Sequence, residues 1–211
     1  ASAAFRPVGA VNAVAWSPDN AAAFAANDIL TIALDTDFVD RPVTRVETVP
    51  FGGRIFSLDY APDGKLAVGG DTFVKVFNNR FTEVTVEAPI AVLSNVQGGG
   101  IVLAAWSPTG LLATAGYNGT SELLLYDETL TEPVVAPVSA SDVRALAWSS
   151  TSLLAVAQGS FVNIYEYSIA KCGSLELVNS TEVEGTVTAL TWASDERLAV
   201  GIDGFGVRIY R

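Results

Sequence analysis

Apolar and polar positions along the chain follow one pattern that recurs five times. Each recurrence opens with an apolar run such as Ile101 to Trp106, passes through a polar turn, and returns as a second apolar run such as Leu111 to Gly116. A third run alternates more, because Lys75, Asn163 and Arg208 stand between Val and Ile neighbours. Short apolar and alternating runs bounded by turn residues predict β-strands and no helix longer than three turns.

The five recurrences align with one another without a gap. An aromatic residue ends the first run of each, and successive aromatics are 44, 46, 42 and 44 residues apart: Trp16, Tyr60, Trp106, Trp148 and Trp192. The second run of each holds an alanine at one fixed place: Ala23, Ala67, Ala113, Ala155 and Ala199. A period of this size is the length of a four-stranded propeller blade. We therefore predict an all-β fold, a β-propeller of five four-stranded blades; a β-sandwich would not repeat one pattern in every unit.

The repeat runs from end to end, which predicts a single domain over residues 1–211. The predicted blades span residues 11–50, 55–90, 101–138, 143–183 and 187–211, preceded by a strand at residues 4–9. The fourth run of each unit is the most polar, and in the third unit it contains Pro133 and Pro137. Prolines fit an outer edge strand, where a missing N–H breaks no ladder hydrogen bond. The fourth strands are therefore predicted on the outside of the blades.

The segments Val11 to Asn20 and Ile55 to Gly64 resemble the WD40 repeat, and the likeness covers nearly the whole chain. Two features depart from it: the closing dipeptide is altered, as in Tyr210-Arg211, and the chain has no histidine for the Gly-His dipeptide. Members of that family usually have seven blades, whereas this sequence offers five. The resemblance implies closure by a strand at residues 4–9 that pairs with the last blade. A closed five-bladed ring and an open ring, completed by a partner or by further blades, both remain possible.

Charge and composition narrow the function. The net charge is −11, with 12 basic and 23 acidic residues and no basic cluster, which disfavours nucleic acid and anionic membrane and favours partners with basic contact surfaces. The absence of histidine excludes a Ser-His nucleophile and a histidine zinc site. Asp59, Asp63 and similar carboxylates are expected mostly in turns, and the lone Cys172 has no histidine to activate it. We predict no catalytic residue, no metal and no cofactor.

Function is then expected on the loops, which vary while the framework repeats. Aromatic and arginine side chains dominate interface energetics, so the loops before the first strands and between the second and third strands supply the candidates for partner binding. These are Phe51, Arg54, Tyr117, Asn118, Asp142, Arg144 and Phe205. The leading hypothesis is a non-enzymatic protein-protein interaction scaffold within a larger assembly; the alternative is a five-bladed, carbohydrate-binding lectin. A cytoplasmic location is expected, although sequons at Asn118 and Asn179 would suit a secreted chain.

Overall fold

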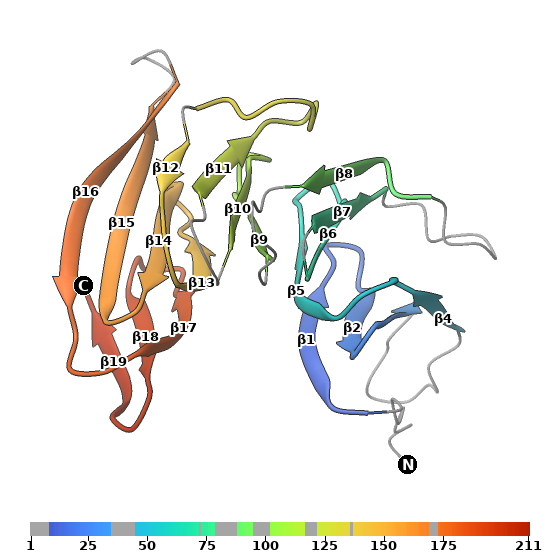
Figure 1. The fold of residues 1–211 in the computed structure, drawn as a ribbon, viewed down its shortest axis with the longest axis horizontal. Coiled ribbons are helices and arrows are strands. Elements are labelled where there is room, and N and C mark those ends of the chain that lie inside the picture. The colour runs from blue at the N-terminus through green and yellow to red at the C-terminus, as the bar shows by residue number, and fades with distance from the viewer. Residues whose placement is uncertain are drawn as a thin grey trace.

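Five antiparallel sheets stand around a central axis as the blades of a β-propeller (Figure 1). The computed structural model describes residues 9–34, 45–71, 73–78, 88–94, 102–116, 122–135, 137–168 and 173–211, and every structural statement below concerns these residues. They form strands and turns, and no helix among them is long and apolar enough to span a membrane. The all-β, five-bladed prediction is confirmed. The strand predicted at residues 4–9 lies outside the described residues except for Gly9.

Strands follow one another within each blade in chain order, four in each of the first four sheets and three in the last. The first blade contains β1 (Val11–Trp16), β2 (Ala22–Ala26), β3 (Ile29–Leu34) and β4 (Arg45–Pro50); the second contains β5 (Ile55–Tyr60), β6 (Leu66–Gly70), β7 (Phe73–Phe77) and β8 (Ala91–Ser94). The third contains β9 (Val102–Trp106), β10 (Leu112–Gly116), β11 (Glu122–Tyr126) and β12 (Val138–Ser139). The fourth contains β13 (Val143–Trp148), β14 (Leu153–Gln158), β15 (Phe161–Ser168) and β16 (Ser174–Glu182), and the fifth β17 (Val187–Trp192), β18 (Leu198–Ile202) and β19 (Gly206–Tyr210).

The first strand of every blade is the innermost, as the aligned apolar runs predict. β1, β5, β9, β13 and β17 lie innermost (Figure 1), and their residues line a central channel of about 680 Å³. Each of the first four of these strands contacts the first strand of the next blade. β9, the middle one of the five, is apolar throughout, which suits a strand with neighbours on both faces.

The fourth strands differ from prediction in two blades. β8 begins at Ala91, just beyond the predicted limit at Ile90, whose N–H donates to the carbonyl of Val76 at 2.8 Å. β12 has only two residues, Val138–Ser139, which pair with Leu123 and Glu122 of β11, and Pro133 lies in the segment before it. An isolated bridge between Tyr126 and Pro133 still holds that segment beside β11. The more polar fourth runs therefore predicted which strands lie on the outer edge of the blades, but not where those strands begin and end.

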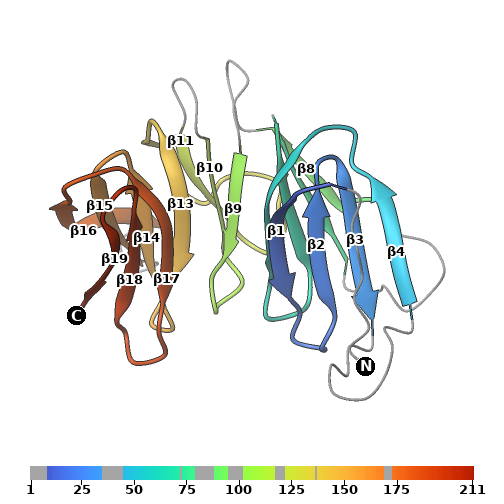
Figure 2. The ribbon, with the colours of Figure 1, turned by 90° about the horizontal axis from the view of Figure 1, so that it is seen from below.

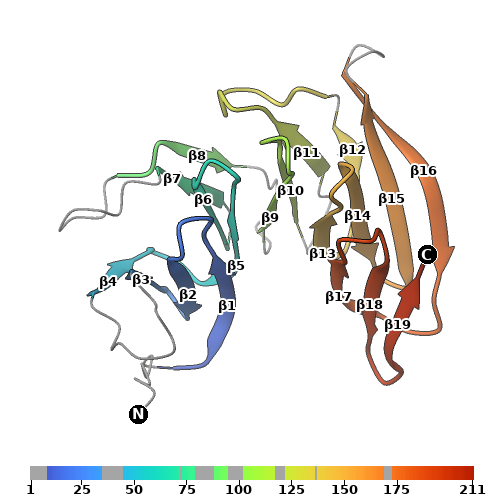
Figure 3. The same ribbon diagram turned by 180° about the vertical axis from the view of Figure 1, so that it is seen from behind.

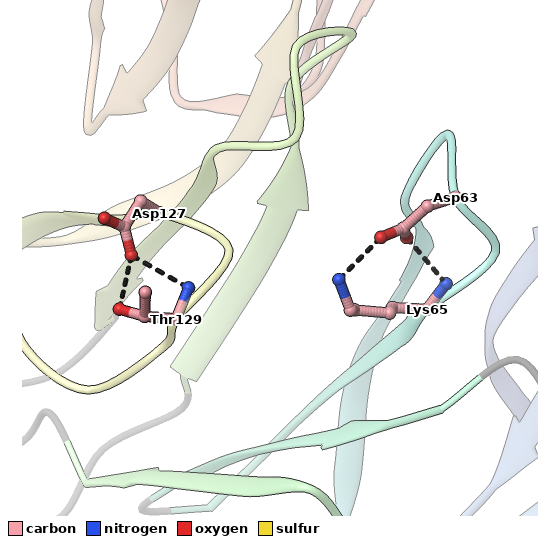
Figure 4. Close-up of polar contacts among 4 residues, drawn as sticks. All are labelled: Asp63, Lys65, Asp127 and Thr129. Atoms are coloured by element: carbon pink, nitrogen blue, oxygen red, sulfur yellow. Dashed lines mark hydrogen bonds and ion pairs between the residues drawn. The ribbon is translucent and has the colours of Figure 1, made fainter.

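Serine hydroxyls and aspartate carboxylates fix the turns between strands. Ser107, buried behind the aromatic of the third blade, accepts the N–H of Leu111 at 2.9 Å, and Ser17 and Ser149 accept equivalent bonds in their blades. Asp63 accepts the N–H of Lys65 at 3.1 Å, as expected of a turn aspartate (Figure 4). Because these local bonds hold the turns, the side chains of the apolar strands are available to pack between blades.

The repeated alanine lies in the contact between successive blades. Ala113 on β10 pairs with Leu125 on β11, and both are fully buried against Leu154 and Val156 of the fourth blade. The alanines of the first, second and fourth blades are also fully buried. A small residue here lets the next blade approach closely, which explains why this position never varies among the repeats.

The blades follow an arc that is open between the first and the last of them (Figures 1 and 3). Seen from the open side, β9 stands between the two end blades (Figure 2). Val207 and Ile209 of β19 are 68% and 57% exposed, whereas Val74 and Val76, at the same places in the second blade, are fully buried. The described residues thus leave one face of each end blade uncovered.

Candidate protein-interaction surface

One end of the propeller carries the turns that precede the first strands together with the turns between second and third strands. Backbone bonds join the two sets: the N–H of Ile55 donates to Asn27 and that of Val187 to Gly159, both at 2.8 Å. The N–H of Arg54 donates to the Asp71 carboxylate at 2.9 Å. These bonds link turns from successive blades into one continuous face, which we call the loop face. The five predicted binding residues that the structure describes belong to its turns or to the strand ends beside them: Phe51, Arg54, Asp142, Arg144 and Phe205.

Phe51 does not present its side chain to the surface. It is 2% exposed, and its ring lies 5.3 Å from that of Phe73, centroid to centroid. The Lys75 ammonium lies 4.5 Å from the Phe51 ring centroid and donates to the Phe51 carbonyl at 2.7 Å. Gly70 provides the space for this ring, since a Cβ on Gly70 would collide with it. As a side-chain contact for a partner the prediction for Phe51 is wrong, because packing below the loop buries the ring.

Arg54 is exposed at the rim of the second blade. Its guanidinium lies 5.6 Å from the centroid of the Phe56 ring, a distance at which the cation is attracted to the ring face. Its backbone is fixed by the bond to Asp71 described above. Arg54 is therefore a cation on a fixed loop, and it is available to a partner.

Arg144 and Asp142 lie side by side in the fourth blade. The Arg144 Nε is 3.4 Å from an Asp142 carboxylate oxygen, and both side chains are partly exposed. Asp142 has a φ of 56°, in the left-handed region, and its carbonyl accepts the N–H of Gly159. The two predicted residues form one ion pair rather than two independent contacts. An exposed pair of this kind contributes little to stability.

Phe205 stands at the tip of the β18–β19 turn in the fifth blade. It is 56% exposed, and a Cβ on Gly185 would touch its ring, so the phenyl group lies over that glycine. Gly204 and Gly206, on either side, both have positive φ, which the tight turn requires. Phe205 is thus a large apolar side chain held outward. Tyr117 and Asn118, the other two candidates, lie outside the described residues.

The opposite end of the channel is lined by the repeated aromatics. Trp16, Tyr60, Trp106 and Trp148 surround a hollow of about 340 Å³ together with the proline turns. Tyr60 and Trp106 are buried, as the repeat predicts, and the Trp148 indole donates to the Ala105 carbonyl of the preceding blade at 3.1 Å. Trp16 is 50% exposed. The expectation that every aromatic belongs to the core is therefore wrong for Trp16, because no described blade precedes the first.

Asp59 is the carboxylate that sequence reasoning placed least well. It lies within β5 on the channel wall rather than in a turn, and it accepts the N–H of Trp106 at 2.6 Å. Burial raises the pKa of this carboxyl from 3.8 to about 6, even though backbone hydrogen bonds from Trp106 and Tyr60 act to lower it. In the sequence, the sign of this position was that Asp59 stands in a mostly apolar run. Asp59 joins the second blade to the third and is the one ionisable side chain among the described channel-lining residues.

Asp63 and Asp127, two other carboxyls with a shifted pKa, lie in exposed turns. Hydrogen bonds from the Thr129 hydroxyl and N–H hold the pKa of Asp127 below its usual value (Figure 4). Burial acts to raise the pKa of Asp63, but the bonds and the charge of Lys65 outweigh it and the net shift is downward. No group of three or more metal-ligating side chains occurs among the described residues. Each of these carboxylates is fully accounted for by its turn.

Known proteins resemble this chain in part of its sequence and in its fold. The family model for the WD domain, G-beta repeat, matches residues 45–78. A chain in the crystal structure of the mitotic checkpoint complex superposes with a TM-score of 0.72 and 18% sequence identity, over 95% of this chain and 62% of that chain. No curated protein sequence gives a match. The chain spans less than two thirds of the length of the structure it resembles, so that likeness concerns the fold alone. The chain is a five-bladed β-propeller that carries a WD40 repeat.

Proposed function

We propose that this protein is a non-enzymatic protein-interaction scaffold whose loop face binds other polypeptides within a larger assembly. The observation that carries the proposal is the contrast between framework and loops. The side chains of the repeats pack between blades. Arg54 and Phe205, in contrast, lie on turns of the loop face and remain exposed among the described residues. Aromatic and arginine anchors of this kind supply much of the energy of protein interfaces.

Charge favours a basic partner. The net charge of −11 gives the surface a negative potential, which speeds encounter with a positively charged patch and disfavours an acidic one. Asp142 and Glu184 contribute to this potential on the loop face, although each is paired with an arginine, Glu184 with Arg208 at 2.5 Å. Association should therefore weaken as salt is raised, because exposed charges are screened.

The lectin alternative finds no feature that favours it. Repeated sugar sites between blades would need the same polar and aromatic cluster in each, and the turns at Arg54, Asp142 and Gly185 share no such cluster. The chain of similar fold belongs to a multi-protein complex, which agrees with the protein-binding proposal. We further infer a cytoplasmic location from the likeness to the WD40 repeat and from the single cysteine. Occupied glycans at the exposed Asn179 or at Asn118, detected by mass spectrometry, would contradict that location.

A pull-down from native extract, quantified by mass spectrometry, tests the scaffold proposal. The test protein carries Arg54→Ala, Arg144→Ala and Phe205→Ala together. A matched control carries Lys65→Ala and Arg197→Ala, in turns at the other end of the propeller, and removes equal charge. Partners that are retained by the control and lost from the test protein support the loop face. Equal retention by both would place binding elsewhere, and glycan-array binding without protein partners would replace the scaffold by the lectin.

A further inference from the structure

The inner strand of the second blade carries two polar side chains at positions that are mostly apolar in the other blades. Ser57 and Asp59 of β5 stand where the other inner strands have alanine, leucine or threonine. Both line the central channel. The Ser57 hydroxyl accepts the N–H of Ala104 at 3.1 Å, and the Asp59 carboxylate accepts the N–H of Trp106 at 2.6 Å. Two side chains of β5 therefore bond to the backbone of β9.

The bond to Trp106 does not explain the charge of Asp59. Ser57 makes a similar bond to the same strand with a neutral hydroxyl, which avoids the cost of burying a carboxylate. Burial raises the pKa of Asp59 to about 6, and no charged group among the described residues contributes to this shift. The strands that pack most closely on β5, namely β1, β2, β6 and β9, contain no ionisable residue. The described residues thus leave this carboxylate without a countercharge.

The same junction between blades leaves an indole N–H unbonded. In the next two junctions the indole N–H donates to a carbonyl of the preceding blade, Trp148 to Ala105 and Trp192 to Ala147, both at 3.1 Å. Trp106 is 6% exposed, and its indole N–H has no hydrogen-bond partner among the described residues. The contact between the second and third blades thus has two unfavourable features that the next two junctions avoid. Such departures from a repeated packing arrangement are expected at functional sites.

Aromatic side chains border the channel beside Asp59. Asp59 directly precedes Tyr60, and Trp106 and Trp148 line both the channel and the aromatic hollow at its end, so the two spaces adjoin. Their volumes of about 680 and 340 Å³ are typical of ligand sites. This wall belongs to β5, β9 and β13, and each of their blades lies between two described blades. The site therefore does not depend on what lies beyond the two end blades.

The chemistry of this wall favours an organic cation. A carboxylate forms strong, charge-assisted hydrogen bonds with an ammonium or guanidinium group, and aromatic rings attract the same cations. The alanine-rich walls suit the aliphatic stem that carries the cation in lysine and arginine. A divalent metal ion would need several oxygen ligands, and no group of three or more metal-ligating side chains occurs in the described parts of the chain.

We propose that the channel binds an arginine or lysine side chain of a partner polypeptide, which enters through the aromatic hollow and pairs its cation with Asp59. The aliphatic stem then lies along the channel wall beside Ala105 and Ala147. The net charge of −11 favours the approach of such a partner. This inference rests on the proposed scaffold function, but it uses the opposite end of the propeller from the loop face.

An NMR titration with a blocked pentapeptide tests the site. The probe has one arginine between two pairs of glycines, a second probe has lysine there, and the control has citrulline, the neutral isostere of arginine. At least one basic peptide should give saturable shifts at the Asp59 carboxyl carbon and the Trp106 indole N–H, and the citrulline peptide should not. A bound cation favours the ionised carboxyl, so the pKa of Asp59 should fall below its value of about 6 at saturation. An unchanged pKa with both basic peptides, or an equal effect of citrulline, would overturn the proposal.

Two protein variants locate the cation. Asp59→Asn keeps an oxygen acceptor for the Trp106 N–H but removes the charge, and it should weaken binding of the basic peptide by about tenfold or more, measured at the Trp106 indole. Asp63→Asn is the matched control, since it removes the same charge from an exposed turn of the same blade. Circular dichroism verifies that both variants fold. Equal binding by the two variants would refute Asp59 as the partner of the cation.

Two further outcomes separate this inference from its alternatives. Free butylammonium or ethylguanidinium that binds as tightly as the peptides would overturn the partner polypeptide and make a small organic cation the ligand. The loop-face variant with Arg54, Arg144 and Phe205 replaced should show the same shifts at Asp59 as the unmodified protein, and their loss would overturn the channel site. A negative titration beside a positive pull-down would thus refute the channel site alone, and the reverse result would refute the loop face alone.

Discussion

Replacing the same position in two blades measures how much stability the contact between blades provides. Leu125 in the third blade and Ile209 in the fifth both lie opposite the repeated alanine, paired with Ala113 and Ala199. Leu125 is fully buried, whereas Ile209 is 57% exposed. The substitutions Leu125→Ala and Ile209→Ala therefore remove similar side chains from opposite environments.

The magnitudes follow from burial. Leu125→Ala leaves a cavity against Leu154 and Val156, whose strands are fixed by their own ladders and cannot close it, and should cost about 3 kcal/mol of unfolding free energy. Ile209→Ala removes a side chain that is less than half buried and should cost about 1 kcal/mol or less. With a urea dependence of about 3 kcal/mol per molar for a chain of this size, the unfolding midpoint should fall by about 1 M and about 0.3 M respectively.

Urea unfolding followed by tryptophan fluorescence provides the measurement, because the indole rings lie at the blade contacts. The unmodified protein and both variants are compared at one protein concentration, so that any self-association is held constant. Midpoint shifts of equal size would refute the reasoning. They would show that the outer face of β19 is covered in solution and that the arc is not open there.

Five other substitutions, in three separate tests, probe the packing and the buried charge. Trp106→Ala should lower the unfolding free energy by about 3–5 kcal/mol through a core cavity, and Trp16→Ala by less than half as much because Trp16 is already 50% exposed; equal melting temperatures for the two variants would contradict this. Ala113→Leu should cost about 1–3 kcal/mol by overpacking a blade contact, whereas Ala199→Leu, on the uncovered face, should be tolerated in the same thermal melts. Because the folded pKa of Asp59 is about 6 against 3.8, the folded state retains this proton where the unfolded state loses it, so unfolding free energy should fall as pH rises from about 4 to 6. The fall is about 3 kcal/mol, and Asp59→Asn should remove that part of the pH dependence; an unchanged profile in the variant would show that other carboxyls cause it.

The repeat made the architecture predictable. It carries no information about features in which one blade differs from another, and the predictions failed at such features. The aligned aromatics and alanines located every inner strand, because each unit solves the same packing problem. They could not show that Trp16 differs from Trp106, since exposure depends on which blades lie on either side. Nor could a loop position reveal that Phe51 is buried under Lys75, although the small residue Gly70 was a hint.

Chemistry within the framework was harder to predict for a related reason. Asp59 was grouped with the turn aspartates because aspartate usually serves turns, yet it stands in an apolar strand and accepts a bond from the next blade. The interaction joins residues 47 positions apart. Contacts of this range leave no local signature in one sequence, and a charged residue out of pattern is their only sign.

The hydrogen bonds between successive inner strands give the propeller a gradient of local stability. The Trp106 N–H reaches Asp59 in the preceding blade, and the indoles of Trp148 and Trp192 reach Ala105 and Ala147 in the same direction. Each blade is thus stabilised by its immediate neighbours, as in a linear array of coupled units. The end blades have one described neighbour each and the third has two, so amide hydrogen exchange should be slowest in β9 and β10 and faster toward β1 and β19. Opening would then proceed inward from the ends, and whatever covers the end blades would set the lifetime of the whole array.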